Sequence, residues 1–300
     1  MFFPPFIKNY ATIGLAAPAG HVAPEVVDQA KRILGDAGFK VISGRYIDQS
    51  HHQFAASDTA RLADLQQMLD HPDIDIILCL RGGYGTIRIV EQLDFTLFKK
   101  HPKWLIGFSD ITVLHAAFQN EGISSIHAAM PKSWRNEEGL TDDFNLLLKF
   151  LKGEWTSYNT TPHPLNRAGE ASGVLRGGNL SLLYALRGTP YDFNPDGTIL
   201  FIEDLSEYLY HIDRMMHNLK LGGVLRKISG LVVGHFTDLK DNNTPFGQTV
   251  EEIIMEAVRE YDYPVLFGFP AGHQSPNYPM VLGSRVKVTV DNEGGQLSYI

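Results

Sequence analysis

The chain has 300 residues, 44% hydrophobic and 20% charged, which is the composition of an ordinary globular protein. Its formal net charge of −8 argues against nucleic acid as a main partner, because phosphate binding needs a basic surface. The single cysteine, Cys79, excludes an intramolecular disulfide and fits a reducing compartment. No apolar run approaches the roughly 18 residues that span a bilayer. We therefore expect a cytoplasmic protein without a membrane partner.

The first half of the chain alternates apolar segments with amphipathic ones. We expect strands at 11–17, 39–42, 74–80, 103–108 and 124–127, and helices at 24–37, 57–69, 86–93, 111–121 and 142–151. The continuous apolar run at 74–80 is typical of a strand covered on both faces. This alternation predicts an α/β fold with a parallel-sheet N-terminal domain, helices on both faces, and a site at the carboxyl ends of the strands.

The second half reads differently. Residues 153–168 are rich in Pro, Asn and Thr without periodicity, so we interpret them as a linker between domains at 1–152 and 169–300. Beyond it we expect strands at 169–175, 198–202, 230–234, 264–267, 285–290 and 296–299, and helices at 179–186, 210–219 and 248–261. This pattern predicts a smaller, β-rich α+β C-terminal domain.

The junction at Ser109 is the most informative local feature. The apolar run 103–108 ends there and a helical pattern follows at once. Free backbone N–H groups at a helix start favour developing negative charge, so a nucleophilic serine would gain there. Ser109 and Asp110 are also common helix-capping residue types, and on the local sequence alone capping is the better explanation.

A glycine-rich loop, Arg81-Gly82-Gly83-Tyr84-Gly85, follows the buried segment 74–80. Its spacing matches neither a dinucleotide fingerprint nor a phosphate loop. The glycines let the backbone approach a ligand closely, which leaves donation of backbone N–H groups to an oxyanion as the functional interpretation. A tight turn without a catalytic role is the alternative.

Two further residues complete a possible catalytic set. Glu203 directly follows an apolar strand, and His273 lies in a loop rich in Gly and Pro; each alone is more often structural. Serine hydrolysis needs a hydroxyl, an imidazole to take its proton and a carboxylate to orient the imidazole. The order Ser109, Glu203, His273 is that of α/β-hydrolases, but the second glycine of G-x-S-x-G is missing, which disfavours that family. The sequence contains no H-E-x-x-H or C-x-x-C pattern, so we expect no metal site.

Five motifs together resemble one family. They are Arg81-Gly82-Gly83-Tyr84-Gly85, Gly107-Phe108-Ser109-Asp110-Ile111-Thr112, Arg176-Gly177-Gly178-Asn179-Leu180, Ile202-Glu203-Asp204 with Ile212-Asp213-Arg214, and Gly272-His273. In this order, and over nearly the whole chain, they resemble the LD-carboxypeptidases, which are serine peptidases. The resemblance implies two domains with the active site between them.

The resemblance also implies roles and a reaction. Ser109 would be the nucleophile, His273 the general base and Glu203 the group that orients His273. The reaction would release the terminal D-alanine from murein tetrapeptides at an L,D bond, in cytoplasmic peptidoglycan recycling. No metal or organic cofactor is implied, and homodimers are common in the family.

The same resemblance suggests how substrate is bound. Backbone N–H groups of Gly83 and Asp110 would form the oxyanion hole. The substrate-binding candidates are Gly82, Tyr84, Arg81, Arg176 and Asn179, and Arg214 is a further candidate partner for a substrate carboxylate. The residues do not distinguish lysine-type from diaminopimelate-type peptides.

Two other functions remain open at this point. A microcin-immunity-type peptidase would cleave a peptide–nucleotide analogue and would need aromatic faces for a nucleobase, for which Trp134, Trp155 and Tyr158 are available. A muropeptide-binding module without activity is the second alternative, but such a module has no reason to keep all three catalytic residue types.

Overall fold

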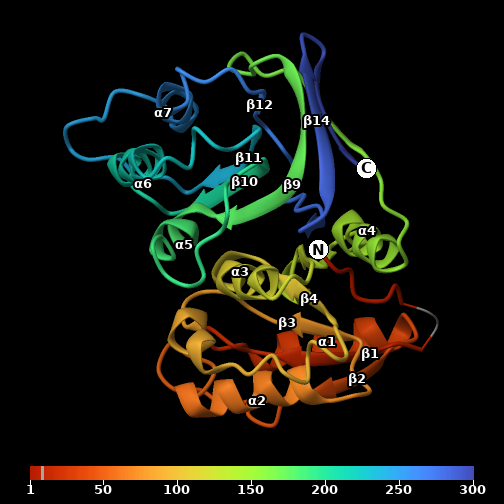
Figure 1. Ribbon diagram of the computed structural model, residues 1–300. Helices are drawn as coiled ribbons and strands as arrows, with labels where there is room; N and C mark the ends of the chain where they lie inside the picture. Colours follow the sequence, from red (N-terminus) through yellow and green to blue (C-terminus); the bar gives the residue numbers. More distant parts are fainter. Residues whose placement is uncertain (8–9) are drawn as a thin grey trace. The chain divides into compact units, whose positions relative to one another are not determined.

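The computed structural model describes residues 1–7 and 10–300, which form two compact units. The first comprises Met1–Glu154 and Tyr278–Val281, and the second comprises Trp155–Asn277 and Leu282–Ile300 (Figure 1). The first boundary between the units, after Glu154, falls within the segment 153–168 that we expect to be a linker. Part of that segment forms a strand, β8 (Tyr158–Thr160), which pairs with the end of the chain in the second unit.

The first unit is built on a six-stranded sheet in the order β13-β5-β4-β3-β1-β2. The strands are β1 (Thr12–Ala16), β2 (Lys40–Ser43), β3 (Ile76–Cys79), β4 (Trp104–Gly107), β5 (Ser125–His127) and β13 (Met280–Leu282). Strands β1 to β5 pair in parallel, as the alternating pattern predicts. The order steps outward from β1 in both directions, which puts a topological switch point between β1 and β3.

Helices α1 (Pro24–Asp36), α2 (Asp58–Asp70), α3 (Thr112–Asn120) and α4 (Asp142–Leu151) complete this unit. Ser57 caps α2 as expected, since its side chain accepts a bond from the Ala60 N–H at 3.3 Å. The helix expected at 86–93 is wrong: two short 3-10 turns, Thr86–Arg88 and Val90–Gln92, occupy that stretch. Its β-branched residues Ile87, Ile89 and Val90 favour regular helix poorly.

The second unit contains a seven-stranded sheet in the order β12-β11-β10-β9-β14-β15-β8. Its further strands are β9 (Gly169–Asn179), β10 (Thr198–Leu205), β11 (Gly230–Thr237), β12 (Val265–Leu266), β14 (Arg285–Asp291) and β15 (Gly294–Tyr299). Strands β9 to β12 run in parallel, whereas β14, β15 and β8 add antiparallel pairs. The sheet is therefore mixed, as an α+β domain requires.

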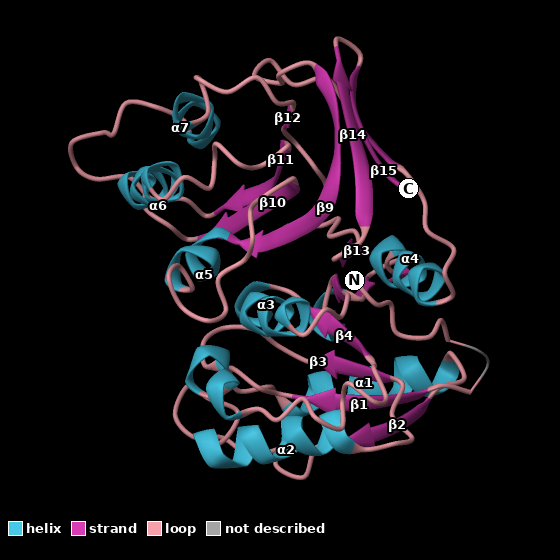
Figure 2. Ribbon diagram, viewed as in Figure 1, coloured by secondary structure: helices cyan, strands magenta, loops and turns pink. Residues whose placement is uncertain are grey.

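Three helices pack on the parallel part of this sheet (Figure 2). They are α5 (Leu180–Ala185), α6 (Leu209–Leu221) and α7 (Val250–Ala257). Their buried faces form one core with β10, β11 and β12, for example through Met215, Ile254 and Leu231. Helix α7 is shorter than the expected 248–261 and begins at a capping box, in which Thr249 and Glu252 bond to each other's backbone.

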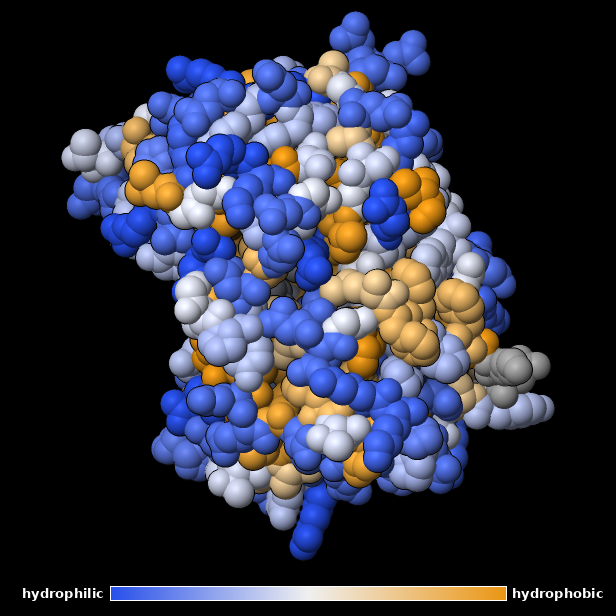
Figure 3. All heavy atoms as spheres, in the orientation of Figure 1, coloured by the Kyte–Doolittle hydropathy of each residue, from blue (hydrophilic) through white to orange (hydrophobic). Residues whose placement is uncertain are grey.

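The surface view in Figure 3 is mostly hydrophilic, with hydrophobic residues in small groups. Within residues 1–7 and 10–300, no helix combines the length and apolar character that crossing a bilayer requires.

Candidate active site

Ser109 occupies a strained turn between β4 and α3. Its φ is 66°, in the left-handed region, where a residue with a side chain is disfavoured by about 1–2 kcal/mol. Phe108 is the N-cap residue of the short 3-10 turn Ser109–Ile111, and Ile111 is the N-cap residue of α3. Neither of these two helix starts receives a capping hydrogen bond from a side chain. The capping interpretation of Ser109 is therefore wrong. Strain of this kind is characteristic of functional sites and of turns that expose a nucleophile.

The glycine loop packs directly against this serine. A Cβ atom at Gly82 would lie 2.9 Å from the Ser109 Cβ, 3.1 Å from its Oγ and 3.2 Å from the Asp110 N, so no side chain fits there. Gly83 has a φ of 100°, which also favours glycine. The backbone of the loop therefore lies close enough to contact a substrate atom that is covalently attached to the Ser109 Oγ.

The orientation of the Gly82–Gly83 peptide is set from the neighbouring strand. The Gly20 N–H, in the loop after β1, donates to the Gly82 carbonyl at 3.0 Å. Because C=O and N–H point in opposite directions in a trans peptide, the Gly83 N–H is directed away from Gly20. These two loops meet at the switch point of the sheet, where α/β proteins usually bind ligands.

Asp110 ties the end of the glycine loop to the serine turn. Its buried carboxylate accepts the Thr86 N–H at 2.8 Å, and the Thr86 hydroxyl lies 2.7 Å from the Asp110 carbonyl and 2.8 Å from its Oδ2. Burial raises the pKa of Asp110 above its ordinary value, and the bonds from Thr86 oppose that rise. The side chain therefore braces the turn, while its backbone N–H remains the expected oxyanion donor.

A buried guanidinium holds the other side of the loop. Arg61, on α2, is 2% exposed and donates to the carbonyls of Pro18 and Gly85, the latter at 3.0 Å, and it is ion-paired with Asp58. Its planar fork of donors suits several carbonyl oxygens at once. Arg61 thus connects the loops after β1 and β3.

Replacing Thr86 with valine tests this bracing. The change keeps the volume but removes the hydroxyl, which leaves buried acceptors of Asp110 without that partner. We expect the free energy of unfolding to fall by about 1–3 kcal/mol and turnover to fall with it. Thr86→Ser should restore both; equal stabilities for the Val and Ser variants in chemical denaturation would contradict the bracing role.

The second unit carries the other two expected catalytic residues, and they are bonded to each other. The Glu203 Oε2 lies 2.6 Å from the His273 Nδ1, with Glu203 fully buried and the His273 side chain 12% exposed. Since an ionised Glu203 only accepts, His273 donates from Nδ1 and its Nε2 carries the lone pair of a base. Gly272 fits closely beside this pair, because a Cβ there would lie 3.1 Å from the Glu203 Oε2.

The charges around His273 favour its protonated form. Burial lowers the pKa of His273, but the hydrogen bond and charge of Glu203 and the charge of Asp204 raise it more, so the pKa lies above its ordinary value. Asp204 itself is buried, and burial together with the charge of Glu203 raises its pKa to about 7. Its oxygens accept bonds from the Asn179 amide, the Ser181 N–H and the Leu205 N–H.

The remaining candidates lie in different settings. Arg81 and Tyr84 are exposed on the glycine loop, and Arg81 donates to the His21 carbonyl. Asn179 is 1% exposed; it bonds Asp204 and caps α5 by accepting from the Leu182 N–H, so we assign it a bracing role. Arg176 is partly buried in β9, and burial lowers its pKa. Arg214 is exposed and lies over the Tyr210 ring.

Sequence reasoning missed the residues that brace the site. Arg61 falls on the buried face of α2 with Leu65 and Met68, at helical spacing, so a charged residue in an apolar stripe was the available signal. Thr86 follows the glycine loop without any distinguishing pattern. Asp204 was part of a family motif but carried no separate role.

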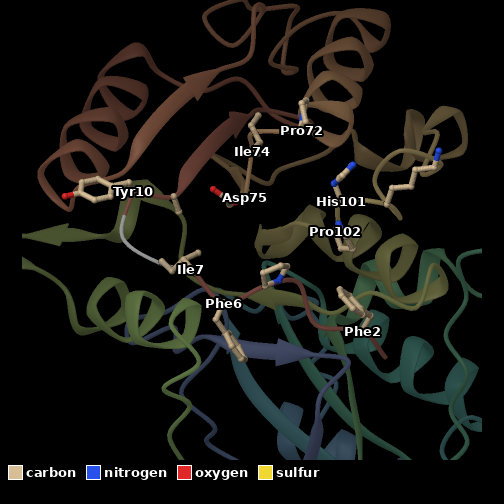
Figure 4. Close-up of a pocket in the computed structure, with 12 residues that line it drawn as sticks. Phe2, Phe6, Ile7, Tyr10, Pro72, Ile74, Asp75, His101 and Pro102 are labelled. Carbon is tan, nitrogen blue, oxygen red and sulfur yellow. The ribbon is translucent and has the colours of Figure 1, made fainter.

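A cavity of about 600 Å³ lies at the amino-terminal ends of strands in the first sheet, opposite to the ends that carry Ser109 and the glycine loop (Figure 4). It is lined by residues that precede β1, β3 and β4, including Ala11, Asp75 and Pro102, and by Phe2 and Phe6 of the N-terminal segment. Ser109 and the glycine loop follow the carboxyl ends of their strands, so this cavity is not part of the candidate site.

Two family models match the chain. The LD-carboxypeptidase N-terminal domain matches residues 13–128, and the LD-carboxypeptidase C-terminal domain matches residues 172–288. The first match includes Ser109 and the glycine loop, and the second includes Glu203 and His273.

Individual proteins agree with this match. The chain is 37% identical to a probable murein peptide carboxypeptidase of Bacillus subtilis, over 94% of this chain and 90% of that protein. It is 30% identical to the murein tetrapeptide carboxypeptidase of Pseudomonas aeruginosa, over 96% and 94%. The crystal structure of muramoyltetrapeptide carboxypeptidase from Oxalobacter formigenes superimposes with a TM-score of 0.87 at 30% identity, covering 96% and 98% of the two chains. The microcin C7 self-immunity protein MccF, at 21% identity and a TM-score of 0.86, shares the fold.

Proposed function

The chain belongs to the LD-carboxypeptidase family of serine-type hydrolases, and we propose that it releases the terminal D-alanine from murein tetrapeptides at an L,D bond. The observation that carries the proposal is the strained Ser109 with Gly82 packed against it. The names of the relatives from Pseudomonas aeruginosa and Oxalobacter formigenes supply the substrate class. We further propose a cytoplasmic role in peptidoglycan recycling and a homodimeric state.

In the proposed mechanism the Ser109 Oγ attacks the scissile carbonyl carbon while the His273 Nε2 takes the hydroxyl proton. Glu203 stabilises the resulting imidazolium through its bond to Nδ1. Backbone N–H groups of Gly83 and Asp110 bind the oxyanion of the tetrahedral intermediate. Collapse breaks the C–N bond, and the D-alanine amine leaves with the proton from His273. Water, deprotonated by His273, then hydrolyses the acyl-enzyme.

A digest of defined peptides tests this function. Purified protein is incubated with tri-, tetra- and pentapeptides of murein type, and the products are identified by mass spectrometry. We expect the tetrapeptide alone to lose one D-alanine. An intact tetrapeptide, or cleavage at an internal bond, would overturn the proposal.

Arg81 is the proposed partner of the substrate's terminal carboxylate. Its guanidinium is exposed, uses one donor for the His21 carbonyl, and has no acidic partner in the described part of the chain. It is the first residue of the glycine loop, two residues before the proposed oxyanion donor Gly83, and its stem lies beside Gly20. A planar fork with free donors suits a carboxylate.

Arg81→Ala is therefore expected to raise KM about 10- to 100-fold, the loss of one bond to a charged group, with a smaller change in kcat. Substrates that end in D-alanine amide should be affected much less. Arg32→Ala, which removes an exposed arginine of α1, serves as the control. An equal loss on acid and amide substrates would show that Arg81 braces the loop instead.

The microcin-type alternative finds little support in the aromatic residues that it needs. Trp134 is 1% exposed and Tyr158 is 4% exposed, so neither offers a face to a nucleobase. Trp155 is partly buried and packs on Tyr299. A competition assay between tetrapeptide and aminoacyl-adenylate analogues distinguishes the two substrates. Labelling of Ser109 by a serine-directed reagent, lost in His273→Ala, would argue against a binding module.

A further inference from the structure

A cavity of about 280 Å³ within the second unit lies beside the proposed base. Gln274, the neighbour of His273, lines it, and so does His235 in β11. The His235 N–H donates to the Ala271 carbonyl at 2.8 Å, and a Cβ at Gly272 would lie 3.1 Å from both the His235 Cβ and the Glu203 Oε2. The cavity and the Glu203–His273 pair therefore share a wall.

Apolar side chains form part of the wall of this cavity. Val233 of β11, Val250 of α7 and Phe267 after β12 line it, and the His163 ring stacks on Phe267 at 5.0 Å between centroids. The cavity is thus lined by residues within β11 and by the residues that directly follow β12. Burying an aliphatic chain against these side chains is favourable, because it removes apolar surface from water.

The charge of the cavity is carried by Glu251. Its carboxylate is partly buried in the first turn of α7 and forms no ion pair in the described part of the chain. Among residues 1–7 and 10–300, no lysine or arginine lines the cavity. Burial lowers the pKa of His235, so that imidazole is neutral near pH 7 and does not offset the charge of Glu251.

The start of α7 offers little to an anion. In the capping box the Thr249 N–H donates to the Glu252 carboxylate and the Glu252 N–H donates to the Thr249 hydroxyl, so two backbone donors of this turn are already used. The carboxylate of Glu251 on the same turn also neutralises part of the positive end of the helix dipole, which leaves less of it for an anionic ligand. A cationic group is therefore the charge that this cavity accommodates best.

We infer that this cavity binds the side chain of the third peptide residue, through an aliphatic stem and a terminal ammonium on Glu251. This inference rests on the proposed function. That side chain branches one carbon from the reacting carbonyl, which must lie next to His273 when the proton moves. A lysine side chain is a four-carbon stem with a compact positive charge. A free carboxylate beside that ammonium, as in diaminopimelate, meets the like charge of Glu251.

The test compares three tetrapeptides that differ only at the third residue: L-lysine, Nε-acetyl-L-lysine and meso-diaminopimelate. In the unmodified protein we expect kcat/KM to be about tenfold or more higher for lysine than for the other two. Glu251→Gln should remove most of that preference. Glu251→Lys should reverse it, so that the diaminopimelate peptide becomes the better substrate.

Glu252→Gln is the matched control, because it removes the same charge from the same helical turn and glutamine still completes the capping box. Its substrate preference should be that of the unmodified protein. If Glu251→Gln keeps the lysine preference, or lowers all three rates equally, the inference is wrong while the proposed function stands. If no tetrapeptide is cleaved by any form, the proposed function fails and the inference falls with it.

Discussion

Replacing Ser109 with alanine is expected to lower kcat by about 10⁴- to 10⁶-fold, because the nucleophile is lost. The protein should stay folded, because the side chain of Ser109 makes no helix-capping bond that the substitution could remove. The measurement is single-turnover release of D-alanine, together with thermal unfolding. Wild-type turnover by a folded Ser109→Ala protein would refute the serine assignment.

The strain at Ser109 gives a second readout at the same position. Glycine accepts a φ of 66° readily, so Ser109→Gly should be more stable than Ser109→Ala by about 1 kcal/mol while both are inactive. Ser57→Ala is the matched control, since Ser57 does cap a helix. That variant should lose about 1 kcal/mol of stability and keep its turnover. A Ser109→Ala variant that loses about 1 kcal/mol of stability and keeps its turnover would instead show that Ser109 caps a helix.

Replacing Glu203 with glutamine is expected to lower kcat by about 10²- to 10⁴-fold, because the neutral amide no longer stabilises the imidazolium and the histidine tautomer is less well defined. Above the pKa of His273, where the imidazole is neutral, stability should change little, because the amide of glutamine can still accept the bond from the ring. Glu207→Gln is the matched control. Glu207 pairs with His211 on the surface of the same unit, and losing that pair should change neither activity nor stability much.

The pH profile adds a test of direction. A general base acts in its neutral form, and the pKa of His273 is raised by its partner, so the acid limb of kcat/KM should lie above the ordinary value near 6.5. In Glu203→Gln this limb should move to lower pH. A raised histidine pKa also stabilises the fold below about pH 6.5, and that contribution is lost as pH rises through the folded-state pKa. Near-normal turnover with a large stability loss would instead make Glu203 a structural carboxylate.

Much of the architecture follows from local patterns. The alternating apolar and amphipathic segments predict the parallel strands β1 to β5 and the helices between them, because strand and helix periodicity reflect burial of one face or both. The place of Ser109 at a strand-to-helix junction is visible in the same way. The order of Ser109, Glu203 and His273 with the glycine loop indicates the family, which the two matching domain models confirm.

Other features depend on contacts between distant segments. The short strands β8 and β13 pair at the edges of the two sheets with segments that are distant in the chain, and residues 86–93, where we expect a helix, form two 3-10 turns instead. Arg61 and Thr86 brace the glycine loop through partners that lie 24 residues or more along the chain. No local pattern specifies such partners.

The sequence alone therefore determined the class of each unit, the loops that hold the chemistry and the residue types available there. Only the tertiary structure decided whether Ser109 caps a helix, because that depends on its backbone angle and on the loop packed against it. It also joined Glu203 to His273 across 70 residues and placed the acidic cavity beside them. Propensity and periodicity act over a few residues, whereas side-chain bonds and cavities arise from packing between segments that the chain order leaves far apart.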